Sequence, residues 1–434
     1  FSLAMHETSG SHSEIAVIAA IYFSAVDEKE IEEDMAELDR LADTAGASVV
    51  ARVTQRRQSP DLAYFLGTGK LEELKESVIS EGADLVIINN QLTPLQQRNL
   101  ENALEVKVID RTALILDIFA QRARTKEGQL QVELAQLNYL LPRLTGKGIE
   151  LSRLGGGIGT RGPGETKLEA DRRRIRRQIT RLEEELDKVR KQRLLQSQPR
   201  HDVPVMVAAL VGYTNAGKST LFNTLTGADV LTENRLFATL DPTLRRIRLP
   251  NGQTIVLSDT VGFIRNLPHS VVAAFRATLE EVVEADIIIH IVDASNPLSH
   301  KQSDAVYEVL EELGVADKPI ITVLNKMDLV EHPQSLQHLA DTAERTVALS
   351  ALNGAGLDDL LDEIVEIMNE RLAVIEVSLP YNRLDILSLL YDTGQVLERR
   401  YDPDGIFVRA EVDIVVAERI KEFVRSKVNL RGEK

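Results

Sequence analysis

Residues 212–220 combine glycines, a lysine and a serine at a spacing that suits phosphate binding. Gly212, Gly217, Lys218 and Ser219 form the pattern G-x-x-x-x-G-K-S between an apolar run and a helical pattern. In that context backbone N–H groups and a helix N-terminus converge on phosphates, the lysine neutralises their oxygens, and the serine hydroxyl binds Mg²⁺. A glycine-rich turn without a ligand would leave the lysine and serine unexplained. The predicted phosphate-binding residues are Gly212, Tyr213, Thr214, Asn215, Ala216, Gly217, Lys218, Ser219 and Thr220.

Residues that can recognise a guanine base follow two later predicted strands. They are Asn325, Lys326, Met327, Asp328, Ser350 and Ala351. Asp328 can accept hydrogen bonds from guanine N1–H and the exocyclic amine, whereas adenine would leave this carboxylate unpaired. Asn325 can reach the other edge of the base, and the stem of Lys326 can lie against its face. Ser350 and Ala351 are expected to add a contact, largely through their backbone.

Two segments between these motifs can respond to the γ-phosphate. The expected switch is Phe237, Ala238, Thr239, Leu240 and Asp241, and the second segment is Asp259, Thr260, Val261 and Gly262. Thr239 can reach Mg²⁺ while the γ-phosphate is present, so hydrolysis would release its segment. Asp259 can hold the hydration shell of Mg²⁺, and the Gly262 N–H can bind the γ-phosphate. This order of motifs predicts a GTPase with Mg²⁺ bound by Ser219 and Thr239.

The expected hydrolytic machinery departs from the best-known scheme at one position. Ras-like GTPases have a glutamine after the glycine of the second segment, which orients the attacking water, and this chain has Phe263 there. The free protein is therefore expected to hydrolyse GTP slowly. Asn215 matches the asparagine with which potassium-stimulated GTPases hold K⁺ against the phosphates, and its alternative role is to brace the loop through local hydrogen bonds. The predicted catalytic residues are Lys218, Thr239, Gly262 and Asn215.

The apolar pattern around these motifs predicts an α/β protein of several domains. We expect a disordered leader (1–13), a small α/β domain (14–110), a helical hairpin with a glycine-rich tip (111–200), a doubly wound P-loop GTPase domain (205–371) and a small α+β domain (372–434). The hairpin helices are expected over 112–141 and 167–195, the second with a coiled-coil seam of Leu168, Ile175, Leu182 and Val189. In the last domain a helix is expected over 384–398, and another helix after the strand 405–413.

The expected hairpin tip, Gly155–Glu165, holds six glycines and one proline in eleven positions, which excludes regular structure. Five arginines follow it at positions 172, 173, 174, 176 and 177. Such a tip can enter RNA, because glycines allow close approach and arginines bind phosphates. A flexible hinge beside a solvated helix is an equally open alternative. The segment Gly67–Lys70 raises a similar question: it can hold an anion or simply form a turn before a helix.

The composition limits the class of protein. The net charge is −16, yet residues 153–200 hold 14 Lys and Arg against 7 Asp and Glu, so one basic arm rather than the whole chain is expected to contact a polyanion. There is no cysteine, which excludes disulfides and thiol catalysis. The apolar run 15–23 lacks a basic flank, because the first Lys or Arg is Lys29. We expect a cytoplasmic monomer without a membrane span.

The chain resembles the HflX family of translational GTPases from about Ile15 into its last domain. The most specific segments are GGGIGTRGPGETKLEADRR (155–173), RTALILDIFAQRARTKEGQLQVELAQL (111–137), and LVGYTNAGKSTLFNTLT with LFATLDPTLR and DTVGFIR. The resemblance implies binding to the large ribosomal subunit in the GTP state and a role in splitting or rescuing stalled ribosomes. It implies that the tip reaches toward the peptidyl transferase centre. It also adds Leu352 to the base site, at a position where many GTPases have lysine. The residues implied to contact ribosomal RNA are Gly155, Gly156, Gly157, Arg161, Gly162, Arg172 and Arg173.

Two other functions share the same motifs. A GTPase acting in ribosome assembly would bind precursor particles, and a nucleotide-dependent RNA-binding switch would have negligible turnover. Lys218, Thr239 and Asp259 favour a working hydrolase over a switch without turnover. Splitting is separated from assembly only by the family resemblance.

Overall fold

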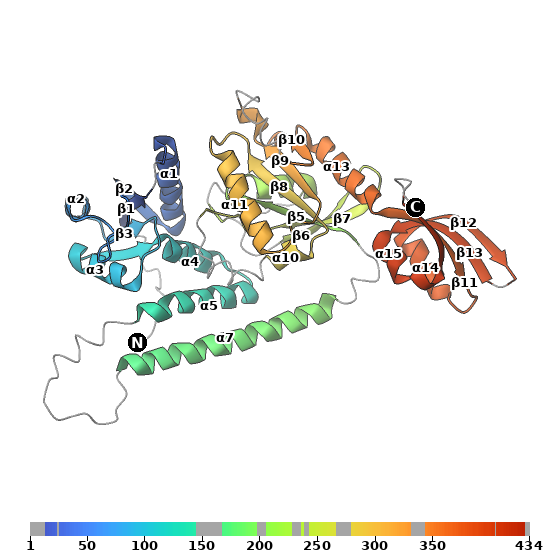
Figure 1. The fold of residues 1–434 in the computed structure, drawn as a ribbon, viewed down its shortest axis with the longest axis horizontal. Coiled ribbons are helices and arrows are strands. Elements are labelled where there is room, and N and C mark those ends of the chain that lie inside the picture. Colours follow the sequence, from blue (N-terminus) through green and yellow to red (C-terminus); the bar gives the residue numbers. More distant parts are fainter. Residues whose placement is uncertain are drawn as a thin grey trace. The chain divides into compact units, whose positions relative to one another are not determined.

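The computed structural model describes residues 14–23, 26–144, 167–197, 205–227, 236–237, 243–265, 279–330, 343–403 and 405–429. Within them the strands form three separate sheets (Figure 1). The chain divides into two compact units, one of residues 1–189 with segments 231–242 and 261–280, the other of the remaining residues. The predicted α/β class is confirmed. The domain boundaries stay predictions, and the expected leader 1–13 lies outside the described residues.

The first sheet belongs to the first unit and is parallel, in the order β2-β1-β3-β4. Its strands are β1 (Glu14–Tyr22), β2 (Ala47–Arg56), β3 (Leu85–Ile88) and β4 (Lys107–Asp110), and its helices are α1 (Glu28–Ala45), α2 (Thr68–Glu81) and α3 (Pro94–Leu104). Residues 16–20 of β1 are all fully buried, as expected for a parallel strand covered on both faces. Gly67 is the N-cap of α2 and Thr68–Lys70 form its first turn, with Lys70 paired to Glu73, so the segment is a helix start.

Two helices follow where one was expected. They are α4 (Arg111–Arg122) and α5 (Lys126–Arg143). The single-helix prediction is wrong because Thr125 is extended and its hydroxyl accepts a hydrogen bond from the Gly128 N–H, which starts a new helix. Helix α7 (Lys167–Ser197) packs against α5 through Leu130, Leu137, Leu182 and Leu186, so the predicted seam is confirmed within the described residues. The tip between α5 and α7 lies outside them.

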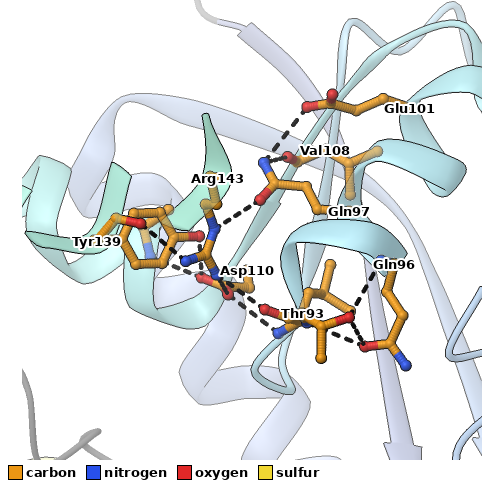
Figure 2. A network of polar contacts seen from close by, with 10 residues as sticks. Thr93, Gln96, Gln97, Glu101, Val108, Asp110, Tyr139 and Arg143 are labelled. Carbon is orange, nitrogen blue, oxygen red and sulfur yellow. Dashed lines mark hydrogen bonds and ion pairs between the residues drawn. The ribbon is translucent and has the colours of Figure 1, made fainter. Parts of the chain in front are cut away.

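A partly buried polar network ties the end of α5 to the first sheet (Figure 2). Asp110, at the end of β4, is fully buried and accepts hydrogen bonds from Tyr139 Oη at 2.9 Å and Arg143 Nη2 at 3.0 Å. The Arg143 guanidinium also donates to Gln97 Oε1 and to the Leu92 carbonyl, each at 2.9 Å. Tyr139 and Arg143 therefore hold the end of α5 to two side chains and one backbone carbonyl of the α/β domain.

The central sheet has the order β10-β9-β8-β5-β7-β6, and only the β6–β7 pair is antiparallel. Its strands are β5 (Val207–Gly212), β6 (Thr243–Arg248), β7 (Thr254–Asp259), β8 (Ile287–Asp293), β9 (Ile320–Asn325) and β10 (Thr346–Ala348). The described helices beside it are α8 (Lys218–Thr226), α10 (Glu280–Glu284), α11 (Ser299–Glu312) and α13 (Leu357–Glu370). The chain order reverses at β5, so ligands are expected at the carboxyl ends of β5 and its neighbours. The predicted doubly wound domain is confirmed.

The last sheet is antiparallel, in the order β12-β13-β11-β14, with β11 (Leu372–Leu379), β12 (Gly394–Asp402), β13 (Gly405–Asp413) and β14 (Val424–Asn429). The helix expected over 384–398 is wrong in its extent. Helix α14 (Leu384–Thr393) stops before Gly394, which begins β12 and lies so close to β13 that a Cβ would meet the Glu411 carbonyl oxygen at 2.4 Å. The helix expected after β13 is present as the short α15 (Ile414–Arg419), and strand β14, which the sequence analysis did not predict, ends the described part of the chain. Every described helix is too short or too polar to cross a membrane.

Candidate nucleotide-binding site

The predicted phosphate loop connects β5 to α8 at the carboxyl end of the central sheet. Its two outer glycines have no room for a side chain. A Cβ on Gly212 would meet the Ile291 carbonyl oxygen at 2.2 Å, and one on Gly217 would meet Asn325 Nδ2 at 2.2 Å. Gly217, at φ 101°, is also left-handed. The glycines are therefore required by close packing, of Gly212 against β8 and of Gly217 against the side chain at the end of β9.

Lys218 is buried at the start of α8, where its ammonium is held inside the loop. Nζ donates to the carbonyl oxygens of Gly212 at 3.0 Å and Tyr213 at 2.7 Å. Burial lowers the pKa of Lys218 to about 8, while the nearby Asp259 carboxylate opposes the shift. The lysine is thus positioned by the carbonyl oxygens of its own loop, and burial destabilises its charge.

Ser219 and Asp259 form a pair of oxygens next to this lysine. The Ser219 hydroxyl donates to Asp259 Oδ2 at 2.8 Å, and Asp259 is fully buried at the end of β7. The adjacent Thr260 donates through Oγ1 to the Leu210 carbonyl at 2.6 Å, which fixes the end of β7 against β5. Hydroxyl and carboxylate oxygens are the ligands that Mg²⁺ prefers, so these residues fit a magnesium ion.

Asn325 holds the predicted base site to the phosphate loop. Its Nδ2 donates to the Ala216 carbonyl at 2.8 Å, and its Oδ1 accepts from the Ala351 N–H at 2.9 Å. One buried amide therefore joins three of the segments that the sequence analysis singled out. Lys326 follows with a left-handed backbone, at φ 64°, and its ammonium contacts the Asp293 carboxylate.

Asp328 is oriented by the last of these segments. The Ser350 hydroxyl donates to Asp328 Oδ1 at 2.5 Å, which orients the carboxylate that the sequence analysis predicts to read the base. Leu352 is 82% exposed, so its side chain adds no buried contact. The arrangement can bind a nucleotide phosphate chain and read a base with a carboxylate.

The comparisons with known proteins agree with this geometry. Matching family models are described as GTP-binding GTPase N-terminal (residues 32–120), GTP-binding GTPase Middle Region (122–200), 50S ribosome-binding GTPase (207–326) and HflX C-terminal domain (335–425). The GTPase HflX of Caldanaerobacter subterraneus subsp. tengcongensis is 50% identical over 94% of this chain and 94% of its own length. The chain belongs to the HflX family. It is therefore a GTPase, an enzyme that hydrolyses GTP to GDP and phosphate.

Two further proteins are similar to this HflX-family chain. The GTPase HflX of Escherichia coli is 44% identical, covering 90% of this chain and 92% of that protein. A GTP-binding protein of Sulfolobus solfataricus, solved with GDP, is 28% identical over 82% of this chain and 98% of that chain, with a TM-score of 0.45. The resemblance predicted from sequence is confirmed by the curated relatives.

Several other predicted site residues of the HflX-family chain lie outside the described residues or outside the second unit. Ala238, Thr239, Leu240 and Asp241 fall outside the described residues, as do Gly155, Gly156, Gly157, Arg161 and Gly162. Phe237, Val261 and Gly262 belong to segments assigned to the first unit. Arg172 and Arg173 lie near the start of α7, where Arg173 is exposed and Arg172 is half-buried.

Residues within or next to the segments 237–241 and 259–262 make contacts in the first unit that the sequence analysis missed. The Leu236 N–H donates to Thr44 Oγ1 at 3.3 Å, and the Phe237 ring meets the edge of Phe119 at a centroid distance of 4.6 Å. Three residues after Gly262, Arg265 forms ion pairs with Glu30 at 2.9 Å and Asp34 at 3.3 Å. No sequence motif predicts these contacts, because each joins a single residue to a helix that lies far away in the sequence.

Asn215 is exposed at the turn of the phosphate loop, with φ 62°. Within the described residues its side chain makes no hydrogen bond, so the bracing contacts expected as its alternative role are not seen there. Phe263 is 4% exposed and has no polar atom that could orient water.

Proposed function

We propose that this GTPase binds the large ribosomal subunit in its GTP state and splits or rescues stalled ribosomes, with hydrolysis releasing it. The observation that carries the proposal is the pairing of a preformed guanine-nucleotide site with a basic helical arm in one HflX-family chain. The description of its central domain as a 50S ribosome-binding GTPase supports the same partner. GTP binding can favour separated subunits only if the GTP form contacts the free large subunit more tightly than the joined ribosome. We further propose that it acts as a monomer in the cytoplasm, where the ribosomes are.

In this proposal the residues of the phosphate loop bind GTP, and Lys218 neutralises the β- and γ-phosphates. Ser219 and Thr239 would hold Mg²⁺, with Asp259 next to its hydration shell; the bound ion supplies positive charge to the phosphate oxygens. The Gly262 N–H would bind the γ-phosphate, and Phe237–Asp241 would be ordered by it. The carboxylate of Asp328 would select guanine, with Asn325 and Ser350 keeping the base site in shape.

Turnover by the free protein is proposed to be slow, because Phe263 cannot position the attacking water. The exposed amide of Asn215 has the position and the free oxygen to hold K⁺ beside the phosphates. Steady-state GTPase rates in KCl and NaCl at equal ionic strength test this point, and Asn215→Ala serves as the comparison. Faster turnover in KCl that Asn215→Ala abolishes supports the cation role, and equal rates in both salts exclude it.

Helix α7 supplies the proposed contact with ribosomal RNA. Its exposed face carries a stripe, which we call the arginine stripe, formed by Arg173, Arg176, Arg177 and Arg181. The stripe lies opposite the seam that packs on α5, so RNA binding would not disturb the hairpin. Arginines contact phosphates directly and stack on bases, and the stripe leads from the glycine-rich tip.

Sedimentation of intact ribosomes with this protein tests the proposal, using a non-hydrolysable GTP analogue and GDP as the two nucleotide states. Splitting is supported if the analogue alone converts ribosomes to free subunits and the protein travels with the large one. Binding to joined ribosomes without splitting would instead favour the RNA-binding switch. Binding restricted to precursor particles would favour the assembly GTPase.

The arginine stripe has a matched test. Arg176→Gln/Arg177→Gln is expected to weaken binding to the large subunit and to reduce the slope of log affinity against log salt by about 1 for each lost phosphate contact. Arg245→Gln/Arg246→Gln is the control, because both residues are exposed on β6 of the GTPase domain. Equal effects of the two pairs would mean that general charge, and not the stripe, attracts RNA.

A further inference from the structure

An ion pair at the edge of the base site links the ends of two neighbouring strands. Asp293 is the last residue of β8, and its register partner on β9 is Asn325, directly before Lys326. Lys326 Nζ lies 2.6 Å from Asp293 Oδ2. The side chains are 24% and 14% exposed, so solvent screens the pair only in part. Nothing in the guanine-binding scheme described above requires Asp293.

The two oxygens of the Asp293 carboxylate have different partners. Oδ1 accepts from the Ser295 N–H at 3.0 Å and from the Ser295 hydroxyl at 2.6 Å. Oδ2 accepts from the Lys326 ammonium. The turn after β8 therefore fixes the carboxylate plane, and the second oxygen remains directed at the lysine. Asp293 is anchored independently of the residue that it holds.

Lys326 is constrained at both of its ends. At the backbone, Asn325 is tied to the phosphate loop and to Ala351, and the left-handed conformation of Lys326 sets where its side chain begins. At the other end, Asp293 holds the ammonium. The carbon stem between them is therefore restricted to few conformations. A free lysine side chain carries about 2 kcal/mol of rotamer entropy, much of which is lost when it is immobilised on binding a ligand.

We propose that Asp293 is a positioning residue for guanine-nucleotide binding, which holds the stem of Lys326 in place as an apolar platform for the base. The inference rests on the proposed role of Lys326 in the base site. Because Asp293 compensates the ammonium, the lysine acts through its stem and not as a free charge. The contribution is made equally to GTP and GDP, since both carry the same base and ribose. Asp293 therefore affects how long a nucleotide stays bound and does not affect cleavage of the γ-phosphate.

The test uses Asp293→Asn, which keeps an oxygen acceptor for the Ser295 turn but removes the charge that attracts the ammonium. Dissociation of fluorescent GDP and of a fluorescent GTP analogue is followed by stopped flow, together with the KM and kcat of GTP hydrolysis. We expect both dissociation rates and the KM to rise by a common factor, about threefold to tenfold, which corresponds to releasing one ordered side chain. The kcat is expected to stay unchanged. Ser295→Ala, which removes one contact of the other carboxylate oxygen, is the control and is expected to change dissociation less than about twofold.

Lys326→Met and the double variant Asp293→Asn/Lys326→Met separate positioning from a structural role. Lys326→Met keeps an apolar stem but lacks the ammonium, so adding Asp293→Asn is expected to have no further effect on dissociation. Additive effects would overturn the proposal, as would a loss of kcat at constant KM in Asp293→Asn. If Lys326→Met weakens nucleotide binding while Asp293→Asn does not, the proposed role of Lys326 in the base site is supported and the positioning role of Asp293 is wrong. If Lys326→Met also leaves dissociation unchanged, the assigned role of Lys326 fails together with the inference.

Discussion

The guanidinium of Arg265 lies 2.9 Å from the carboxylate of Glu30, although 235 residues separate them in the sequence. Asp34 contacts the same guanidinium from the next turn of α1, at 3.3 Å. All three side chains are at most 20% exposed. The segment that follows the D-T-V-G motif is thereby attached to the first helix of the chain. An arginine between two carboxylates can meet both with directed N–H groups.

Removing this arginine is expected to destabilise the first unit. Arg265→Ala leaves Glu30 and Asp34 close together and mostly buried, which is expected to lower the free energy of unfolding by about 1–3 kcal/mol. Burial already raises the pKa of Asp34, and Arg265 opposes that rise. A carboxyl whose pKa is raised in the folded state destabilises the folded protein as the pH rises from its unfolded pKa to its folded pKa. The variant is therefore expected to lose less stability at pH 5 than at pH 7, measured by calorimetry.

A double-mutant cycle with Glu30→Gln identifies the source of that loss. Coupling of 0.5 kcal/mol or more between Arg265→Ala and Glu30→Gln, about the size seen for contacting residues, is expected if the pair acts directly. Strictly additive effects would contradict the ion pair as the cause.

Nucleotide affinity is expected to fall as pH rises through 8, because the pKa of Lys218 is lowered to about 8 in the free protein. The phosphates require the charged ammonium, so binding above that pH takes up a proton and weakens by up to about tenfold per pH unit. The free protein should show the opposite trend, since a lysine with a lowered folded pKa gains stability between pH 8 and its unfolded pKa. Titration of fluorescent GDP between pH 7 and 9 measures the first effect. An affinity that is flat over this range would contradict a buried, charged Lys218.

Gly217→Ala is expected to abolish nucleotide binding. Its Cβ would meet Asn325 Nδ2 at 2.2 Å, and Asn325 cannot move without breaking its bonds to Ala216 and Ala351. Gly314→Ala is the matched control, because Gly314 is also left-handed, at φ 70°, but no atom lies within 4 Å of the added Cβ. The control is expected to cost about 1 kcal/mol of stability and to bind GDP normally. Retained GDP binding by Gly217→Ala would show that the loop relaxes away from Asn325.

Asp328→Asn is expected to change the base preference from guanine to xanthine. The amide can donate to the oxygen at position 2 of xanthine, where guanine carries an amine, and the unmatched guanine contact should cost about 1–3 kcal/mol. Competition of GDP and XDP for the fluorescent nucleotide measures the change. Asp304→Asn, an exposed acid on α11, serves as the control. An unchanged preference for GDP would disprove the role of the Asp328 carboxylate.

Apolar periodicity and motif spacing were sufficient to predict most of the fold and the kinds of residue in the candidate site. The phosphate loop could be predicted because Gly212, Lys218 and Ser219 act through their spacing alone. The break at Thr125 and the strand after Gly394 could not, since the first depends on one capping hydroxyl and the second on how close β13 runs. The contacts of Arg265 and Asp293 also escaped prediction, because each is a single residue whose partner is chosen by tertiary packing. The sequence therefore revealed features that act through a spaced pattern, and it missed features that depend on one side chain and one partner, whether near or far along the chain.

One boundary between the two units falls within the D-T-V-G motif, at a single peptide bond. Thr260 is the last residue of its segment in the second unit and is bonded to the Leu210 carbonyl beneath the phosphate loop. Val261, the next residue, begins a segment of the first unit that is anchored four residues later by Arg265. The D-T-V-G motif is therefore shared between the two units: Asp259 and Thr260 are held within the second unit, whereas Val261 and Gly262 belong to the segment that Arg265 fixes within the first.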